Sequence, residues 1–419
     1  MSQSSALPAV PVRPGTVRVG PVAARTLVAD LERHRGPKSG LVIGAGAGSA
    51  VLAAAVDALL PGDRLAIVAP PGGTADLRDD VVARGRWVAD RIRVLDSAAE
   101  AETADVIVLA EPLVGPAEQV RAELDELAKG LEPGGVLTVC SVAVPVTASG
   151  EAAAELGRQS LLFGVGSDLV LRNAPPLRVH RLRFTTADPA TAERLTPAYR
   201  PSSVPVTQEM HIDSNGVAAA GIAVGVAALL KLTRPKSRLW LLPALAAGPV
   251  AAFFRDPERV VPDDPRAVVA ASDGKVLAVE RRYDARFADG EMLRIAVFLS
   301  VLDVHVNRAP VAGRVTDYFV TDGGYAAAMK PLAEHNVAAY TVLDTTRGTV
   351  VVAQRTGLIA RRIVQRAPIG ALLAKGERFG LIRFGSRTDV YLPAEAAEPL
   401  VTPGDRVLGG ETVIARWNS

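Results

Sequence analysis

A glycine–serine pair near the end of the chain, Gly385-Ser386, has the residue types for an attack of a side chain on its own backbone. Glycine accepts backbone angles that other residues avoid, so a serine hydroxyl can approach the preceding carbonyl closely. Such an attack would turn the peptide into an ester, and elimination would then free a chain ending at Gly385. The dehydroalanine left at position 386 would hydrolyse to a pyruvoyl group.

An attacking serine needs a base, and the base needs an orienting group. His305 lies in the alternating segment Asp303-Val-His-Val-Asn307 and is the candidate base. Asp273, on a Ser-Asp-Gly turn, is the candidate orienting acid. Taken alone, a strand histidine is more often structural, and Asp-Gly is a common turn. His335 is a weaker candidate for contacts with a substrate, and we expect no metal site.

A pyruvoyl group would serve the decarboxylation of an α-amino acid. Loss of carbon dioxide leaves a carbanion, so an electron sink must be conjugated to the amine, and proteins usually borrow pyridoxal phosphate for this purpose. No lysine of this chain stands in a recognisable context for that cofactor. A ketone derived from the backbone would do the same work through a Schiff base with the substrate amine.

Five segments surround these residues, and their order and spacing resemble the short bacterial and archaeal form of phosphatidylserine decarboxylase. The resemblance covers about residues 208–419. The segments are Phe253–Arg259, Ser272–Val276, Phe298–Pro310, Ala360–Ile363 and Lys375–Arg387. Because all five stand in order, the resemblance is far more specific than any one of them.

The resemblance implies a lyase that converts phosphatidylserine to phosphatidylethanolamine, with Asp273, His305 and Ser386 as its self-cleavage set. Cleavage at Gly385-Ser386 would leave a large β chain, Met1–Gly385, held to a small α chain, Ser386–Ser419. Longer relatives carry a second histidine where this chain has Arg308, so His305 could serve maturation, decarboxylation or both. A related serine phospholipid or a soluble amino acid is the alternative substrate.

These residues must be positioned by a strand-rich second half. Apolar strand-like runs separated by turn signals predict a compact β-sandwich or barrel. The expected strands are 268–271, 293–298, 314–320, 340–342, 350–354 and 412–417. A carrier module without catalysis is the rival reading. Such a carrier would need a lysine at an exposed hairpin tip, and Lys275 is the one candidate.

Two apolar stretches, residues 216–230 and 239–254, precede this β-rich region, with a basic loop between them. Each stretch is shorter than the roughly 20 residues that cross a bilayer. A basic loop between apolar helices favours a hairpin that dips into one leaflet and meets anionic headgroups. The protein is therefore expected at the cytoplasmic face of the cell membrane as a peripheral protein. A buried core hairpin and two membrane spans are the alternatives.

The first half alternates short apolar runs with amphipathic ones, which predicts a doubly wound, mostly parallel sheet. Its first strand ends in Gly44-Ala-Gly46-Ala-Gly48 and leads into a helix, a pattern that suits an anion or ribose. This half resembles class I methyltransferases, which bind S-adenosylmethionine. That family's ribose-binding acid is missing after the strand at residues 65–69. A fold that has lost its ligand is favoured over methylation of the ethanolamine headgroup.

The whole chain is long enough for two domains. We expect a flexible tail at 1–19, a methyltransferase-like domain at 20–185, a linker at 186–207 and a decarboxylase domain at 208–419. The 47 basic and 45 acidic residues nearly balance, which argues against a nucleic-acid-binding face. A single cysteine, Cys140, and an N-terminal segment without the pattern of a secretory signal favour an intracellular setting.

Overall fold

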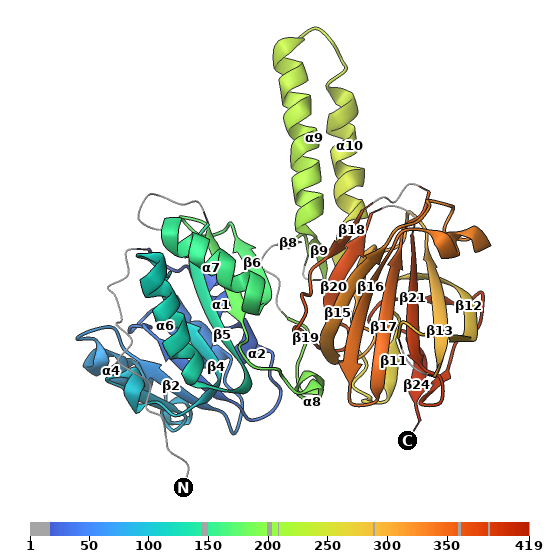
Figure 1. Cartoon of the computed structure of the whole chain (residues 1–419). Coiled ribbons are helices and arrows are strands. Elements are labelled where there is room, and N and C mark those ends of the chain that lie inside the picture. Colours follow the sequence, from blue (N-terminus) through green and yellow to red (C-terminus); the bar gives the residue numbers. More distant parts are fainter. Residues whose placement is uncertain are drawn as a thin grey trace. The chain divides into compact units, whose positions relative to one another are not determined.

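The computed structural model describes residues 17–143, 150–198, 203–207, 209–287, 290–358, 362–383 and 386–418. Contacts between residues divide the chain into two units, Met1–Pro201 and Ser202–Ser419, and Figure 1 labels many of their elements. The segment expected as a linker, residues 186–207, contains the short helix α8 (Pro189–Glu193) and the strand β8 (Val204–Pro205).

Among the described residues, the first unit is built on a sheet of seven strands in the order β3-β2-β1-β4-β5-β7-β6. The strands are β1 (Ser39–Ile43), β2 (Arg64–Val68), β3 (Ile92–Leu95), β4 (Ala104–Leu109), β5 (Leu131–Val142), β6 (Gly164–Val170) and β7 (Leu177–Leu182). β1 to β5 run parallel, and β7 pairs antiparallel with both β5 and β6. The expectation of a mostly parallel sheet is therefore confirmed.

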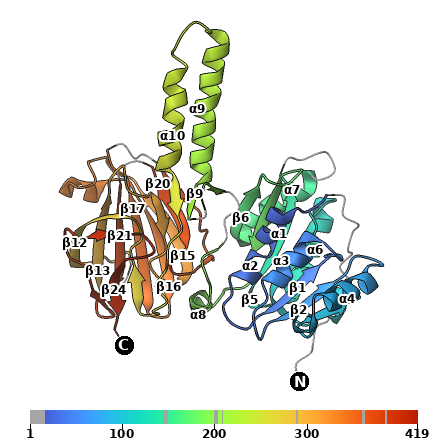
Figure 2. The ribbon, with the colours of Figure 1, turned by 180° about the vertical axis from the view of Figure 1, so that it is seen from behind.

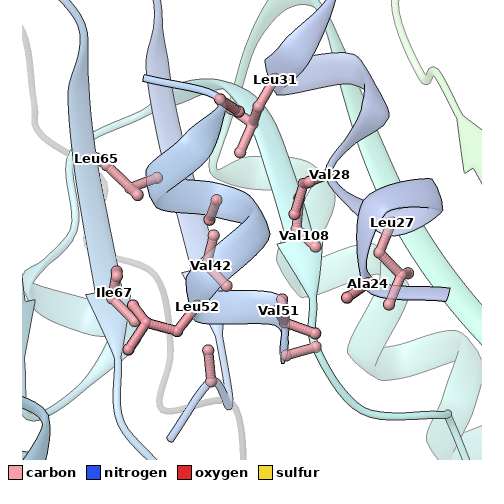
Figure 3. Packing of buried hydrophobic residues seen from close by; sticks show 14 of the residues in the cluster. Ala24, Leu27, Val28, Leu31, Val42, Val51, Leu52, Leu65, Ile67 and Val108 are labelled. Carbon is pink, nitrogen blue, oxygen red and sulfur yellow. The ribbon is translucent and has the colours of Figure 1, made fainter. Parts of the chain in front are cut away.

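Helices cover both faces of this sheet. They are α1 (Pro21–Leu27), α2 (Ala29–Glu32), α3 (Ala50–Asp57), α4 (Thr74–Ala83), α5 (Arg86–Ala89), α6 (Ala117–Lys129) and α7 (Gly150–Phe163), with the 3-10 turn η1 (Ala98–Glu100). Val42 of β1 belongs to the same core cluster as Leu27 and Leu52 (Figure 3), whereas Leu41 belongs to a second cluster with Leu124. Neighbouring strand residues face opposite sides, so a strand covered on both sides is apolar throughout.

The second unit contains a hairpin of two apolar helices, α9 (Ser214–Thr233) and α10 (Leu241–Phe253). The two helices lie side by side and project from the sheets of this unit (Figures 1 and 2). With 20 residues α9 is longer than the stretch expected from the sequence, and it spans about 30 Å. Within the described part of the chain, α9 is the one helix long and apolar enough to cross a membrane.

The rest of the second unit consists of antiparallel sheets. The largest has the strand order β19-β15-β16-β17-β21-β13-β12-β23, and the small ones are β10-β9-β8, β11-β24-β22 and β14-β20-β18. The expected β-rich architecture is confirmed. Figure 1 shows β21 between β17 and β13, so this strand is paired on both edges.

The strands of the second unit have the following bounds. They are β9 (Met210–Ile212), β10 (Arg255–Pro257), β11 (Ala267–Val269), β12 (Gly274–Tyr283), β13 (Glu291–Leu299), β14 (Val306–Arg308), β15 (Gly313–Thr321), β16 (Ala338–Thr345), β17 (Gly348–Arg355), β18 (Ile363–Gln365), β19 (Leu372–Leu373), β20 (Arg378–Ile382), β21 (Ser386–Pro393), β22 (Ala397–Pro399), β23 (Arg406–Val407) and β24 (Val413–Trp417). The 3-10 helix η2 (Pro331–His335) lies between β15 and β16 in the sequence.

Candidate active site

Ser386 is the first residue of β21 and pairs with Leu299 of β13. Its side chain is fully buried, and its Oγ has no hydrogen-bond partner among the described residues. Gly385, the other half of the expected cleavage site, lies outside the described residues. A buried hydroxyl that no neighbouring side chain restrains can act as a nucleophile once a base takes its proton.

The turn that carries Asp273 lies against the Ser386 side of β21. Residues two apart on a strand share a face, so Thr388 projects on the same side as Ser386. The Oγ1 of Thr388 lies 2.6 Å from the Oγ of Ser272, and both side chains are buried. Because Ser272 directly precedes Asp273, the turn that carries this candidate acid contacts the face of β21 on which Ser386 lies.

Asp273 is nevertheless bound by partners that the sequence did not indicate. Its two carboxylate oxygens accept hydrogen bonds from Nη2 of Arg259 at 2.9 and 2.7 Å, and Oδ1 accepts one from the N–H of Gly409 at 2.8 Å. Burial raises the pKa of this carboxyl, while Gly409 and Arg259 act to lower it. The described hydrogen bonds of Asp273 do not include His305, so its predicted orienting role remains a proposal.

His305 has the protonation state that a base requires. Its Nδ1 lies 2.9 Å from the carbonyl oxygen of Asp303, which can only accept, so Nδ1 carries the proton and Nε2 the lone pair. Burial lowers the pKa of His305 to about 4, so the ring is neutral at pH 7. The ring of Phe253 packs against it with the two centroids 4.3 Å apart.

Two chain connections bring His305 towards Ser386. The carbonyl of His305 accepts a hydrogen bond from the N–H of Ile382 at 3.2 Å, and Ile382 precedes Ser386 by four residues. On the other side, Leu299 is the register partner of Ser386 and precedes His305 by six residues. The short span of chain on both sides limits how far His305 can lie from Ser386.

Arg308, at the place of the second histidine of longer relatives, has a structural role. Its buried guanidinium donates from Nη2 to Asp256 at 2.9 Å, and Asp256 also pairs with Arg378 at 2.5 Å. Burial lowers the pKa of Arg308 to about 10. These ion pairs join the segment Phe253–Arg259 to the strand that follows His305. Three of the five segments that the sequence singled out, Phe253–Arg259, Phe298–Pro310 and Lys375–Arg387, are thus in contact.

The base of the apolar hairpin also reaches this site. Asp213, which caps α9, accepts hydrogen bonds from Arg366 at 2.5 and 2.7 Å. Asn215 accepts one from Nη2 of Arg383, two residues before the expected cleavage site, at 2.9 Å. Phe253, which contacts the candidate base, is the last residue of α10. The base of the hairpin therefore contacts residues around Ser386, and the same two helices carry an exposed apolar surface.

The opposite face of β21 carries a buried ionic cluster. The fully buried Asp389 lies 2.8 Å from Nε of Arg387 and 2.8 Å from Nε of Arg355. Burial alone would raise the pKa of Asp389, but the neighbouring guanidinium groups hold it below its ordinary value. Glu334 accepts from Arg294 at 2.6 Å and from Arg387 at 3.0 Å. This cluster fixes the strand directly after the expected cleavage site.

Two buried amides beside the site were missed from the sequence. Gln354 of β17 donates from Nε2 to Oδ1 of Asn307 in β14 at 2.6 Å, and both side chains are fully buried. Asn307 stands in the His305 segment, where it could have been noticed. The one sequence feature that could have indicated Gln354 is its polar side chain directly after the apolar run 350–353.

Two weaker candidates lie elsewhere. His335 is exposed on η2, whose neighbour Glu334 contacts the face of β21 opposite to Ser386. Lys275, the residue of the carrier alternative, is exposed but lies within β12, where it pairs with Phe298 on one edge and Arg406 on the other. It is therefore not at a hairpin tip, which removes the feature that the carrier alternative required.

The glycine loop of the first unit does not fit S-adenosylmethionine well. Gly44 and Gly48 have φ of 87° and 66°, which glycine tolerates, and Gly46 lies between them. The N–H of Gly48, which an anionic ligand group would use, already donates to Oδ2 of Asp80 at 2.8 Å. The end of β2, Ala69-Pro-Pro-Gly72, offers no carboxylate for a ribose. We therefore assign no methyl transfer to this unit.

Solved methyltransferase structures are similar to the N-terminal region. The C-terminal domain of precorrin-6Y C5,15-methyltransferase from Rhodobacter capsulatus is 16% identical, with a TM-score of 0.30 over 44% of this chain and 100% of that one. Mitomycin 7-O-methyltransferase MmcR is 21% identical, with a TM-score of 0.29 over 39% of this chain and 54% of that one.

The second unit is similar to curated enzymes. The phosphatidylserine decarboxylase family model matches residues 248–415. The phosphatidylserine decarboxylase proenzyme of Symbiobacterium thermophilum is 49% identical over 182 residues, which are 42% of this chain and 84% of that protein. That of Desulfotalea psychrophila is 43% identical over 206 residues, which are 48% of this chain and 96% of that protein. With the buried serine, the neutral histidine and three of the expected segments in contact, this chain belongs to the phosphatidylserine decarboxylase family.

Proposed function

We propose that this protein decarboxylates phosphatidylserine to phosphatidylethanolamine, with a pyruvoyl group that it makes from Ser386. The observation that carries the proposal is that Ser386 is buried and its hydroxyl is not hydrogen-bonded to any described residue. Its hydroxyl is buried at the start of a central strand, and no described residue binds it. A serine kept for stability alone would be hydrogen-bonded at such a position.

Maturation begins when the Nε2 lone pair of His305 takes the hydroxyl proton of Ser386. The Oγ then attacks the carbonyl carbon of Gly385, the peptide C–N bond breaks, and an ester and a free amine form. Loss of the Cα proton breaks the Cβ–O bond, which releases the Gly385 carboxylate and leaves dehydroalanine. One water enters and one ammonia leaves to give the pyruvoyl group, so atoms and electrons balance.

The pyruvoyl group, at the N-terminus of the small chain, supplies an electron sink conjugated to the substrate amine. The residues around position 386 fit such a group, because the register pairs Ser386 with Leu299 of β13 and Arg387 with Arg355 of β17. These pairings hold the new terminus in place after cleavage. His305, neutral and buried, is the group that would carry protons at this site, and Asp273 lies on the turn that contacts the same face of β21.

The large and small chains should stay together after cleavage. β21, which belongs to the small chain, pairs with β13 and β17, which belong to the large chain. β24, also of the small chain, pairs with β11 of the large chain. Removing the small chain would therefore unpair strands inside the sheets.

The apolar hairpin supports a lipid substrate at the cytoplasmic face of the cell membrane. Large apolar side chains are exposed along both helices, as in Leu229 and Leu245, and the loop between the helices is basic. Apolar helical surface of this kind enters the interface of a bilayer, and cations beside it meet anionic headgroups. A soluble amino acid as substrate would leave this surface without a purpose.

Replacing both Leu229 and Leu245 by glutamate should weaken binding to phosphatidylserine vesicles about tenfold or more, because charge opposes insertion. Cosedimentation with the vesicles measures the effect. Val82→Glu, at an exposed apolar residue of the first unit, is the matched control and should bind as the unchanged protein does. Self-cleavage should be complete in both variants. Unchanged vesicle binding of the double variant would exclude the hairpin as the membrane contact.

The intact mass of the purified protein tests the proposal as a whole. Two chains are expected under denaturing conditions, and the small chain should be lighter than Ser386–Ser419 by one ammonia. The same preparation should release carbon dioxide from phosphatidylserine vesicles and not from free serine. An uncut chain, or a small chain with an ordinary serine at its start, would contradict the pyruvoyl mechanism. Activity on free serine alone would overturn the lipid assignment.

A further inference from the structure

The amide pair formed by Asn307 and Gln354 has bonding capacity that the protein does not use. The single contact between the amides, Nε2 to Oδ1 at 2.6 Å, leaves Nδ2 of Asn307 and Oε1 of Gln354. Neither atom has a hydrogen-bond partner among the described residues, although both side chains are fully buried. If both amides were turned over, one donor and one acceptor would still remain, so the conclusion does not depend on the assignment of N and O.

The pair lies beside the proposed reaction centre. Gln354 of β17 is the register partner of Thr388 in β21. Ser386 lies two residues before Thr388 on β21, so the two side chains share one face of the sheet. Diagonal neighbours of this kind are roughly 7–8 Å apart, within reach of a long side chain. Asn307 follows His305 by two residues. The amide pair thus connects the strand after the base with a strand that flanks the nucleophile.

The surroundings preserve room for these amides. A Cβ at Gly380, which is paired with Asn307, would come within 3.1 Å of Nε2 of Gln354 and 2.7 Å of the carbonyl oxygen of Val364. A buried amide with an unused donor or acceptor destabilises the fold, and apolar residues of similar shape would not carry that penalty. Two such residues in contact beside Ser386 therefore indicate a polar ligand.

We propose, on the basis of the proposed function, that Asn307 and Gln354 bind the serine headgroup of the substrate. The free N–H of the pair donates to the α-carboxylate, and the free carbonyl accepts from the amino group. One donor and one acceptor match a headgroup that carries an amine and a carboxylate on the same carbon.

Neutral amides also suit the reaction better than a cation would. The carboxylate is lost as carbon dioxide, so a guanidinium bound to it would stabilise the ground state more than the transition state and slow the reaction. A neutral N–H orients the carboxylate and stabilises the ground state less than a guanidinium would. The charged side chains of β21, Arg387 and Asp389, accordingly lie on its opposite face, in the ionic cluster.

Asn307→Asp and Gln354→Met test the assignment. Asn307→Asp keeps the oxygen that binds Gln354, removes the donor and places a negative charge near the carboxylate. Gln354→Met keeps the volume and removes the acceptor. In the cleaved enzyme, each should lower kcat/KM for phosphatidylserine between about tenfold and a hundredfold, mainly through KM. The intact mass should show complete cleavage. Gln159→Met, which removes a buried amide of the first unit, should leave kcat/KM unchanged.

A second measurement does not depend on the pyruvoyl group. The uncut Ser386→Ala protein should bind glycerophosphoserine in calorimetry, and adding Asn307→Asp or Gln354→Met should weaken that binding by a similar factor. Incomplete cleavage with normal kcat/KM in the cut fraction would place the amide pair in maturation and overturn the proposal. Unchanged kcat/KM and unchanged glycerophosphoserine affinity in both variants would also overturn it. An uncut wild-type chain would refute the proposed function instead, and the calorimetry would still judge the headgroup site.

Discussion

Replacing Ser386 by alanine is expected to leave a full-length chain without decarboxylase activity. No described residue hydrogen-bonds to the serine Oγ, so its removal breaks no such bond and the fold should persist. Without the oxygen there is no ester, no elimination and no pyruvoyl group. Intact mass should show a single chain, and carbon dioxide release from phosphatidylserine vesicles should fall to the uncatalysed level.

Thr388→Val is the matched control for this variant. It removes another buried hydroxyl from the same face of β21, one that contacts Ser272. It should lower the free energy of unfolding by about 1 kcal/mol and leave cleavage complete. Ser386→Cys keeps a nucleophile at position 386 and should still break the peptide bond, with a different rate. Decarboxylation by the Ser386→Ala protein would rule out the serine as the source of the prosthetic group.

Replacing His305 by alanine should slow self-cleavage about 100- to 10,000-fold, the usual contribution of a positioned base. In the unchanged protein, the pKa of about 4 keeps His305 neutral near pH 7. The cleavage rate should therefore be flat around neutral pH and fall as the pH drops towards 4, because protonation removes the lone pair. The appearance of the small chain in freshly translated protein, followed by mass or gel at several pH values, measures this rate.

His335→Ala is the control for the histidine assignment. This residue is exposed on η2, so its removal should change neither the rate nor its pH dependence. Normal cleavage in the His305 variant would remove His305 from maturation. Impaired cleavage in the His335 variant would point to a different base. Either result would be clear in the same translation experiment.

The lowered pKa of His305 also predicts a dependence of stability on pH. The unfolded chain binds a proton to this histidine near pH 6.5, whereas the folded chain binds it only near pH 4. The free energy of unfolding should thus fall as the pH is lowered from 6.5 to 4, by on the order of 3 kcal/mol at most. His305→Gln should lose this contribution. Both proteins should carry Ser386→Ala, so that uncut chains are compared.

The sequence predicted the first unit well because its signals are local. The run around Leu41 is apolar at every position since helices cover both faces of β1, and such runs identify buried parallel strands. The antiparallel pair β6–β7 was not predicted, because Gly164–Val170 mixes glycine and polar residues and is only partly buried. Its strand character depends on pairing with β7.

In the second unit, the sequence indicated candidate site residues but not the partners that bind them. Ser386, His305 and Asp273 were identified by residue type and by the ordered segments around them. The bonds from Arg259 and Gly409 to Asp273 were not, because they depend on how distant loops meet. Gln354 lay hidden for the same reason, since only the register of β17 against β21 sets it diagonally opposite Ser386. β12 was missed because Glu280, Arg281 and Arg282 make its second half look like a loop.

The ionic cluster on the far face of β21 has a consequence for how the enzyme can be produced. After cleavage, Asp389 would belong to the small chain, whereas its partners Arg355 and Arg294 would belong to the large chain. A large chain made alone would have to bury two guanidinium groups without this carboxylate, which is strongly unfavourable. The two pieces should therefore fail to assemble when expressed from separate genes and mixed. The uncut chain must therefore fold first, and cleavage can follow only after the ion pairs of this cluster have formed.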